Sequence, residues 1–138
     1  MKEKKDLKKL IQDSWYKQAM RDLDVANLCI SNGFYEWACF CYQEATVKVI
    51  KAAIKKLGLE SFRHSIFSLL ETLNERIHIP EELFEIAKEI DKHYIISRYP
   101  GANMLKPPYE NYKIEDAQRV KNLSKQIIQF IEQQIIKN

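Results

Sequence analysis

The residues best placed to do chemistry lie between Asp91 and Pro100. On a helix Asp91, Tyr94 and Arg98 share one line, because they follow one another at steps of three and four residues. Tyr99 carries this polar edge into a proline-stiffened loop. A guanidinium can pair with a phosphate, and a tyrosine ring can stack on a base. The alternative is a structural cluster in which Arg98 ties down the loop through carbonyl groups, and the residue types alone leave both interpretations open.

A second pattern is a basic ridge. Lys48, Lys51 and Lys55 recur at three- and four-residue steps, while the segment 71–91 is acidic. A molecule with one basic and one acidic face can steer a partner or pair with itself. The plainer alternative is that the lysines complement the dipole at a helix C-terminus and that the acidic surface is an ordinary solvated one.

The sequence contains no motif for a metal site, a serine nucleophile or a phosphate-binding loop. The three histidines, His64, His78 and His93, are isolated, and histidines so spaced pack, cap or pair more often than they bind metal. No serine stands in a G-x-S-x-G elbow, and no glycine-rich phosphate loop is present. We therefore expect no metal and no cofactor.

The positive charge of the chain is concentrated at its start, and its cysteines bear on the cellular compartment. The 138 residues carry a net charge of +3, and residues 1–9, with five lysines, account for the excess. We expect residues 1–6 to form a frayed helix entry rather than an RNA-binding arm.

Cys29, Cys39 and Cys41 are odd in number, and no two of them form a C-x-x-C pair. They therefore predict neither a disulfide framework nor a metal-chelating pair. With neither a signal peptide nor a membrane span in the sequence, we expect a cytoplasmic protein.

Hydrophobic periodicity predicts one helical domain over residues 1–138. Apolar residues spaced by three and four predict a first helix from about Leu7 to Ile30, with Ile11 and Trp15 facing inward, and Gly33 as its left-handed cap. The remaining predicted helices are about 34–57, a short one near 66–73, 80–98 and 114–136, and residues 99–113 are predicted to be non-helical. Short links between long helices predict an all-α, antiparallel up-down four-helix bundle plus one short extra helix.

The order of several segments resembles the HEPN domains (higher eukaryotes and prokaryotes nucleotide-binding). These segments are A-M-R-D-L-D-V-A from Ala19, G-F-Y-E-W-A-C-F-C-Y-Q-E-A-T-V-K-V-I-K-A from Gly33, H-S-I-F-S-L-L from His64 and I-D-K-H-Y-I-I-S-R-Y-P from Ile90. The resemblance covers nearly the whole chain. It implies a HEPN-like helical bundle that is usually dimeric. The branch with the R-Y-P block is often found beside a minimal nucleotidyltransferase, in systems that behave like toxin–antitoxin pairs.

Many HEPN domains are metal-independent ribonucleases with an Arg-x(4–6)-His motif, and this sequence lacks that motif. The nearest arrangement is reversed, with His93 preceding Arg98. Enzymatic activity is therefore not our first expectation. The alternative is an endoribonuclease in which His93 of one subunit and Arg98 of another meet at a dimer cleft, as acid/base and transition-state stabiliser.

Our first hypothesis is a homodimeric HEPN-type binding protein for a nucleotide, an RNA or a nucleotidyltransferase partner. The candidate ligand-binding residues are Asp91, Tyr94, Arg98, Tyr99, Lys48, Lys51 and His64. In this hypothesis Arg98 pairs with a phosphate, Asp91 orients Arg98, Tyr99 stacks on a base, and Lys48 adds positive field.

Overall fold

The computed structural model describes the backbone of residues 2–101 and 105–137, and the side chains of these residues other than 2, 3, 6, 7, 136 and 137. The α-helices are α1 (Lys2–Gln12), α2 (Ser14–Ser31), α3 (Tyr35–Lys56), α4 (Ile66–Leu73), α5 (Glu81–Asp91), α6 (His93–Ile96) and α7 (Ile114–Lys137). A 3-10 helix, η1, spans Pro108–Asn111. Within the described residues no strand forms, so the all-α prediction is confirmed.

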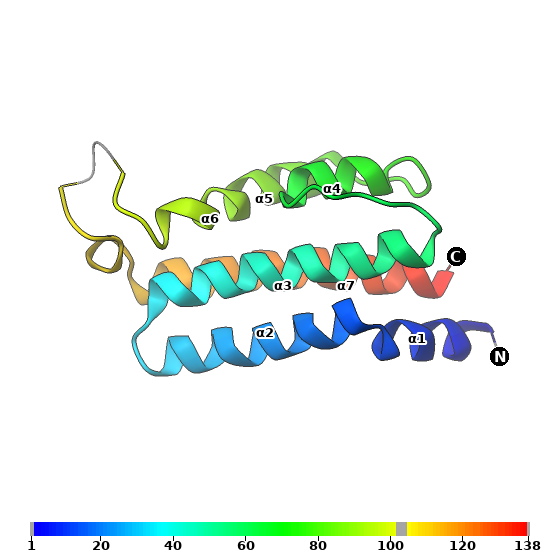
Figure 1. Ribbon diagram of the computed structural model, residues 1–138, viewed down its shortest axis with the longest axis horizontal. Helices are drawn as coiled ribbons and strands as arrows, with labels where there is room; N and C mark the ends of the chain where they lie inside the picture. Colours follow the sequence, from blue (N-terminus) through cyan, green and yellow to red (C-terminus); the bar gives the residue numbers. More distant parts are fainter. Residues whose placement is uncertain (1, 102–104, 138) are drawn as a thin grey trace.

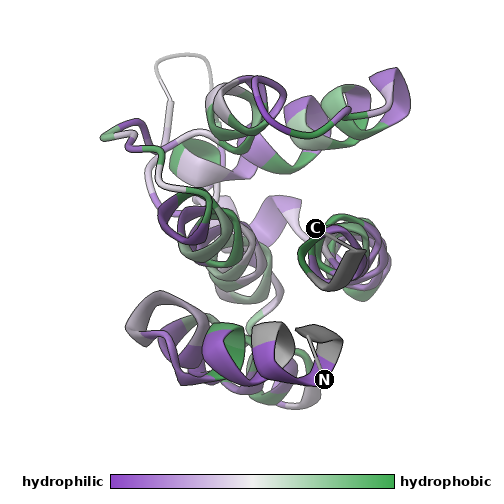
Figure 2. Ribbon diagram, turned by 90° about the vertical axis from the view of Figure 1, so that its right-hand side faces the viewer, coloured by the Kyte–Doolittle hydropathy of each residue, from purple (hydrophilic) through white to green (hydrophobic). Residues whose placement is uncertain are grey.

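The long helices run up and down. In Figure 1, α2, α3 and α7 lie alongside one another, and α4, α5 and α6 form a further layer against α3. The view down the bundle shows apolar residues turned toward the space between these helices (Figure 2). The structure is therefore the predicted up-down bundle, in which α5 and α6 together fill the place of the fourth helix and α4 is the short extra one.

The helix α3 occupies the centre of the bundle. Alanines at seven-residue intervals, Ala38, Ala45 and Ala52, are almost fully buried. They share the side of α3 that carries Tyr42, whose hydroxyl lies 2.5 Å from Asn27 Oδ1 of α2. Small side chains at this spacing permit close approach of two helices.

The first predicted helix is in fact two. Asp13 interrupts it, and its carboxylate accepts a hydrogen bond from the Trp15 amide at 2.8 Å, which caps the start of α2. Because of this break Ile11 and Trp15 are 42% and 40% exposed, so the prediction that they face the core was wrong. The side chain of Leu7 lies outside the described residues. The backbone is helical from Lys2, and fraying of residues 1–6 stays a prediction.

Two further boundaries differ from the prediction. The helix predicted over 80–98 ends at Asp91, and α6 resumes after a turn at Lys92. The predicted non-helical stretch 99–113 contains η1, whose first residue, Pro108, is buried. The predicted cap at Gly33 is confirmed, since its φ of +82° is readily accessible only to glycine.

Candidate functional site: an arginine among aromatic rings

Arg98 follows α6 and lies over a group of aromatic rings. Its guanidinium carbon is 4.2 Å from the ring centroid of Phe40, 4.7 Å from that of Tyr94 and 5.2 Å from that of Tyr99. Nε and Nη2 both donate to the carbonyl oxygen of Tyr94, at 2.9 and 2.6 Å. The guanidinium is therefore held among the rings by two hydrogen bonds and by cation–π attraction.

The Arg98 surface, as we call it, consists of Arg98, Phe40, Tyr94 and Tyr99 with the neighbouring Trp37. Trp37 packs edge-on against Phe40, with centroids 6.0 Å apart. Tyr99 is 56% and Trp37 45% exposed, whereas Arg98 and Tyr94 are half-buried. Two further exposed apolar side chains, Ile95 and Ile96, come from α6 itself. Aromatic rings around a fixed cation thus stay open to solvent at this end of the molecule.

His64, another of the predicted site residues, borders this surface. Its ring centroid lies 5.0 Å from that of Tyr94, and its Nε2 is 2.6 Å from Glu44 Oε2. Glu44 holds the histidine from α3, one turn beyond Phe40. Trp37, Phe40 and Glu44 were not predicted as site residues, although their three- and four-residue spacing places them on one line of α3 with Lys48.

Asp91 has a different role from the expected one. Its Oδ1 accepts a hydrogen bond from the Ile66 amide at 2.8 Å, and its Oδ2 accepts one from the Phe67 amide at 3.0 Å. Gln43 Nε2 also donates to Oδ1, at 3.4 Å. Asp91 thus caps α4 and ties it to α3 and α5, while the Tyr94 carbonyl orients Arg98. Burial raises the pKa of this carboxyl, although the two amide hydrogen bonds oppose the shift.

Each lysine of the basic ridge contacts a different partner. Lys48 forms an ion pair with Asp22 of α2. Lys51 lies over the Trp15 ring, 5.0 Å from its centroid, and Lys55 Nζ is 3.0 Å from Asp13 Oδ2. The structure therefore gathers Tyr94, Arg98, Tyr99 and His64 in one place but leaves Lys48 and Lys51 farther along α3.

His93 is buried rather than displayed. Only 7% of its surface is exposed, and its Nδ1 is 2.7 Å from the Tyr112 hydroxyl, which anchors the chain after η1. Burial, helped by the nearby charge of Lys92, lowers the pKa of His93 to about 4, while Asp116 and Glu89 oppose the shift. The ring is thus neutral at physiological pH and turned away from Arg98's open surface.

The three cysteines are free, and burial raises the pKa of each. Burial raises the pKa of Cys39 to about 12 and that of Cys41 to about 11, so both stay protonated and are poor nucleophiles. Among the described residues no three His, Cys, Asp or Glu side chains gather in a way that could hold a metal ion. No helix in this part of the chain is long and apolar enough to cross a bilayer.

The up-down helical bundle and the R-Y-P block at its end are features of a HEPN domain. The sequence profile described as HEPN domain matches residues 12–134, and the chain belongs to the HEPN family.

Solved structures agree with this assignment. The protein TT1696 from Thermus thermophilus is 36% identical, with a TM-score of 0.82 over 86% of this chain and 94% of that one. ST0689, described as an archaeal HEPN homologue, is 36% identical, with a TM-score of 0.74 over 88% and 94%. A HEPN domain protein from Thermotoga maritima, TM0613, is 33% identical, with a TM-score of 0.71 over 88% and 96%. Among curated proteins no match was found.

We predict that Asp91→Ala lowers the free energy of unfolding by about 1–3 kcal/mol, because it leaves the Ile66 and Phe67 amides without their acceptor. Urea denaturation measures this. Glu85→Ala, which removes an exposed carboxylate from the same helix, serves as the matched control and should change stability by less than about 0.5 kcal/mol. Unchanged stability of Asp91→Ala would show that the carboxylate is not needed as a cap.

A second prediction concerns pH. Unfolded His93 takes up its proton near pH 6.5 and folded His93 near pH 4, so the unfolded state binds more protons between these values. The contribution of His93 to stability is complete above pH 6.5 and is lost as pH falls toward 4, by up to about 3 kcal/mol. In His93→Gln, the unfolding free energy measured from pH 7.5 to 4 should fall less steeply. The same pH dependence of the unfolding free energy in both proteins would contradict the lowered pKa of His93.

Proposed function

We propose that this HEPN protein is a binding module whose Arg98 surface docks a partner protein, a minimal nucleotidyltransferase, within a toxin–antitoxin-like pair. The observation that carries the proposal is the fixed guanidinium of Arg98 among Phe40, Tyr94 and the exposed Tyr99. Tryptophan, tyrosine and arginine are the residues that contribute most to binding energy at protein interfaces. The R-Y-P block supports the choice of partner, since it resembles the branch associated with nucleotidyltransferases.

The geometry of Arg98 favours a protein over a free phosphate as its partner. Two of its N–H groups already donate to the Tyr94 carbonyl, which limits bidentate pairing with a phosphate. The exposed rings of Trp37 and Tyr99 near it are instead suited to contact with aromatic and aliphatic side chains. We propose further that the chain works as a homodimer, which the resemblance to the usually dimeric HEPN domains supports.

The ribonuclease alternative receives less support. His93 would have to exchange protons at the surface, but its ring is buried and hydrogen-bonded to Tyr112. A base whose pKa lies near 4 is also a weak proton acceptor at neutral pH. Geometry and proton affinity therefore both argue for the binding module.

The proposal is tested by co-purification of the tagged chain with the nucleotidyltransferase of its native organism, followed by titration calorimetry of the reconstituted pair. We expect Arg98→Ala and Tyr99→Ala each to weaken binding by about thirtyfold, because each removes a residue of the interface centre. Light scattering of the free chain should give twice its mass of 16.4 kDa.

The matched control is Tyr109→Ala, which removes an exposed tyrosine of η1 outside the Arg98 surface. It should bind as the unchanged protein does, and circular dichroism should show that all three variants keep their helical content. Failure to retain a nucleotidyltransferase, or an equal loss of binding in Tyr109→Ala, would refute the proposal.

A further inference from the structure

A continuous basic surface lies toward the end of the bundle opposite the Arg98 surface. Three adjoining hollows form it; the first two share Lys55, and the second and third share Lys9 and Asp13. Figure 1 places α1 and the end of α3, which line these hollows, at the other end of the molecule from α6. We call this surface the basic end. The lysines that line it are Lys5, Lys8, Lys9, Lys51, Lys55 and Lys56.

Positive charge dominates the basic end. Among the described residues that line the three hollows, two are acidic, Asp13 and Glu60, and Asp13 is already paired with Lys55 at 3.0 Å. The start of the chain adds to the excess, because residues 1–9 hold five lysines and two acids. This end of the molecule therefore attracts an anionic partner.

Phe62 projects from the basic end. Its side chain is 95% exposed, although the loop that carries it is ordered. Before the ring, Arg76 Nη1 donates to the Leu57 carbonyl at 3.2 Å. Next to it, the Arg63 amide donates to Ser61 Oγ at 3.3 Å. A fixed loop thus presents a bare aromatic ring to water, and its transfer to an apolar environment is favourable.

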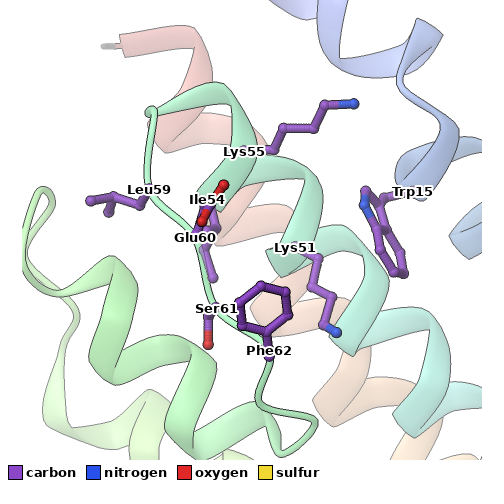
Figure 3. A pocket seen from close by; sticks show the side chains of 8 residues that line it. All are labelled: Trp15, Lys51, Ile54, Lys55, Leu59, Glu60, Ser61 and Phe62. Carbon is purple, nitrogen blue, oxygen red and sulfur yellow. The ribbon is translucent and has the colours of Figure 1, made fainter.

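Two more apolar side chains are exposed beside the lysines. Trp15 is 40% exposed, and the Lys51 ammonium lies 5.0 Å from its ring centroid. Figure 3 shows the Lys51 side chain between those of Trp15 and Phe62. Ile11 is 42% exposed and follows Lys8 by three residues, so the two share one side of α1. Apolar groups and cations are therefore mixed on this surface.

This mixture matches an anionic bilayer better than a nucleic acid. Lysines are attracted to anionic headgroups, and apolar side chains among them can enter the boundary between headgroups and acyl chains. Proteins that bind single-stranded nucleic acid instead stack bases on rings along a charged groove. A ring as exposed as Phe62 projects outward rather than lining a groove, and Ile11 has no ring on which a base could stack.

We propose that the basic end binds the surface of an anionic lipid bilayer. Phe62, Trp15 and Ile11 enter the boundary between headgroups and acyl chains, and the lysines of the basic end lie at the level of the lipid phosphates. The contact is with the bilayer surface and needs no membrane-spanning helix. It is independent of the docking proposal, because Arg98 lies toward the other end of the molecule and stays open to a partner (Figure 1).

The test is co-sedimentation of the full chain with vesicles of phosphatidylglycerol and phosphatidylcholine in equal parts, and with vesicles of phosphatidylcholine alone. We expect at least tenfold stronger binding to the anionic vesicles, and we expect added salt to weaken it. No binding to the anionic vesicles, or equal binding to both kinds, would overturn the proposal. A chain that binds a single-stranded RNA oligonucleotide but not the anionic vesicles would assign the basic end to nucleic acid instead.

Insertion of the apolar side chains is measured separately. In Trp37→Phe, Trp15 is the single tryptophan of the chain, and its fluorescence should be quenched by brominated phosphatidylcholine in the anionic vesicles. Bound protein whose Trp15 is not quenched would show attachment by charge alone and would contradict the proposed insertion.

Two variants locate the contact. Phe62→Ala should weaken vesicle binding at least tenfold, because it removes the most exposed ring, and its exposure means that the fold should stay intact. The double variant Lys5→Glu with Lys9→Glu should also weaken binding at least tenfold, since it replaces two attractive charges by repulsive ones. Circular dichroism should show unchanged helical content in both.

Each variant has a matched control elsewhere in the molecule. Tyr109→Ala removes an exposed ring of η1, and Lys121→Glu with Lys125→Glu makes the same charge change at the same spacing on exposed positions of α7. Both controls, and Arg98→Ala, should bind the anionic vesicles as the unchanged protein does. Equal losses in the controls, or full binding by Phe62→Ala, would contradict the assignment of the basic end.

Discussion

Polar contacts from the middle of α3 to three neighbouring helices organise this structure. Tyr42 meets Asn27 of α2, Gln43 donates to Asp91 of α5, and Thr46 Oγ1 lies 2.7 Å from Ser124 Oγ of α7. Buried and partly buried hydrogen bonds of this kind specify which helix faces which, because a shifted register would leave polar groups unpaired. The apolar residues around them supply most of the driving force, and these three contacts fix the arrangement.

The burial of α3 leaves one strip of it partly exposed, and this strip carries the α3 residues of the Arg98 surface. Trp37, Phe40, Glu44, Lys48, Lys51 and Lys55 recur along it at three- and four-residue steps. Its first part meets α6 and forms the Arg98 surface with aromatic rings. Its last part meets Asp13, Trp15 and the loop 57–65 and is basic. A single helix thus presents two chemically different surfaces about four turns apart.

Helical periodicity predicted the fold because each long helix buries a continuous apolar stripe, and glycine and proline mark several of the ends. It did not reveal the break at Asp13, since the stripe continues across a residue that is both an N-cap and a partner of Lys55. The candidate site was predicted in part. Tyr94, Arg98, Tyr99 and His64 do come together, but Asp91 serves α4, whose start is 25 residues earlier in the chain. Contacts over such separations depend on tertiary packing and leave no local pattern in the sequence.

The central claim, that a partner protein docks on the Arg98 surface, can be tested through the two tryptophans. The chain contains only Trp15 and Trp37, one at each surface, so their indole N–H signals in a two-dimensional proton–nitrogen NMR spectrum report on the two sites separately. We expect the nucleotidyltransferase to shift the Trp37 signal and to leave the Trp15 signal in place. Movement of the Trp15 signal alone, or of neither signal, would contradict the account.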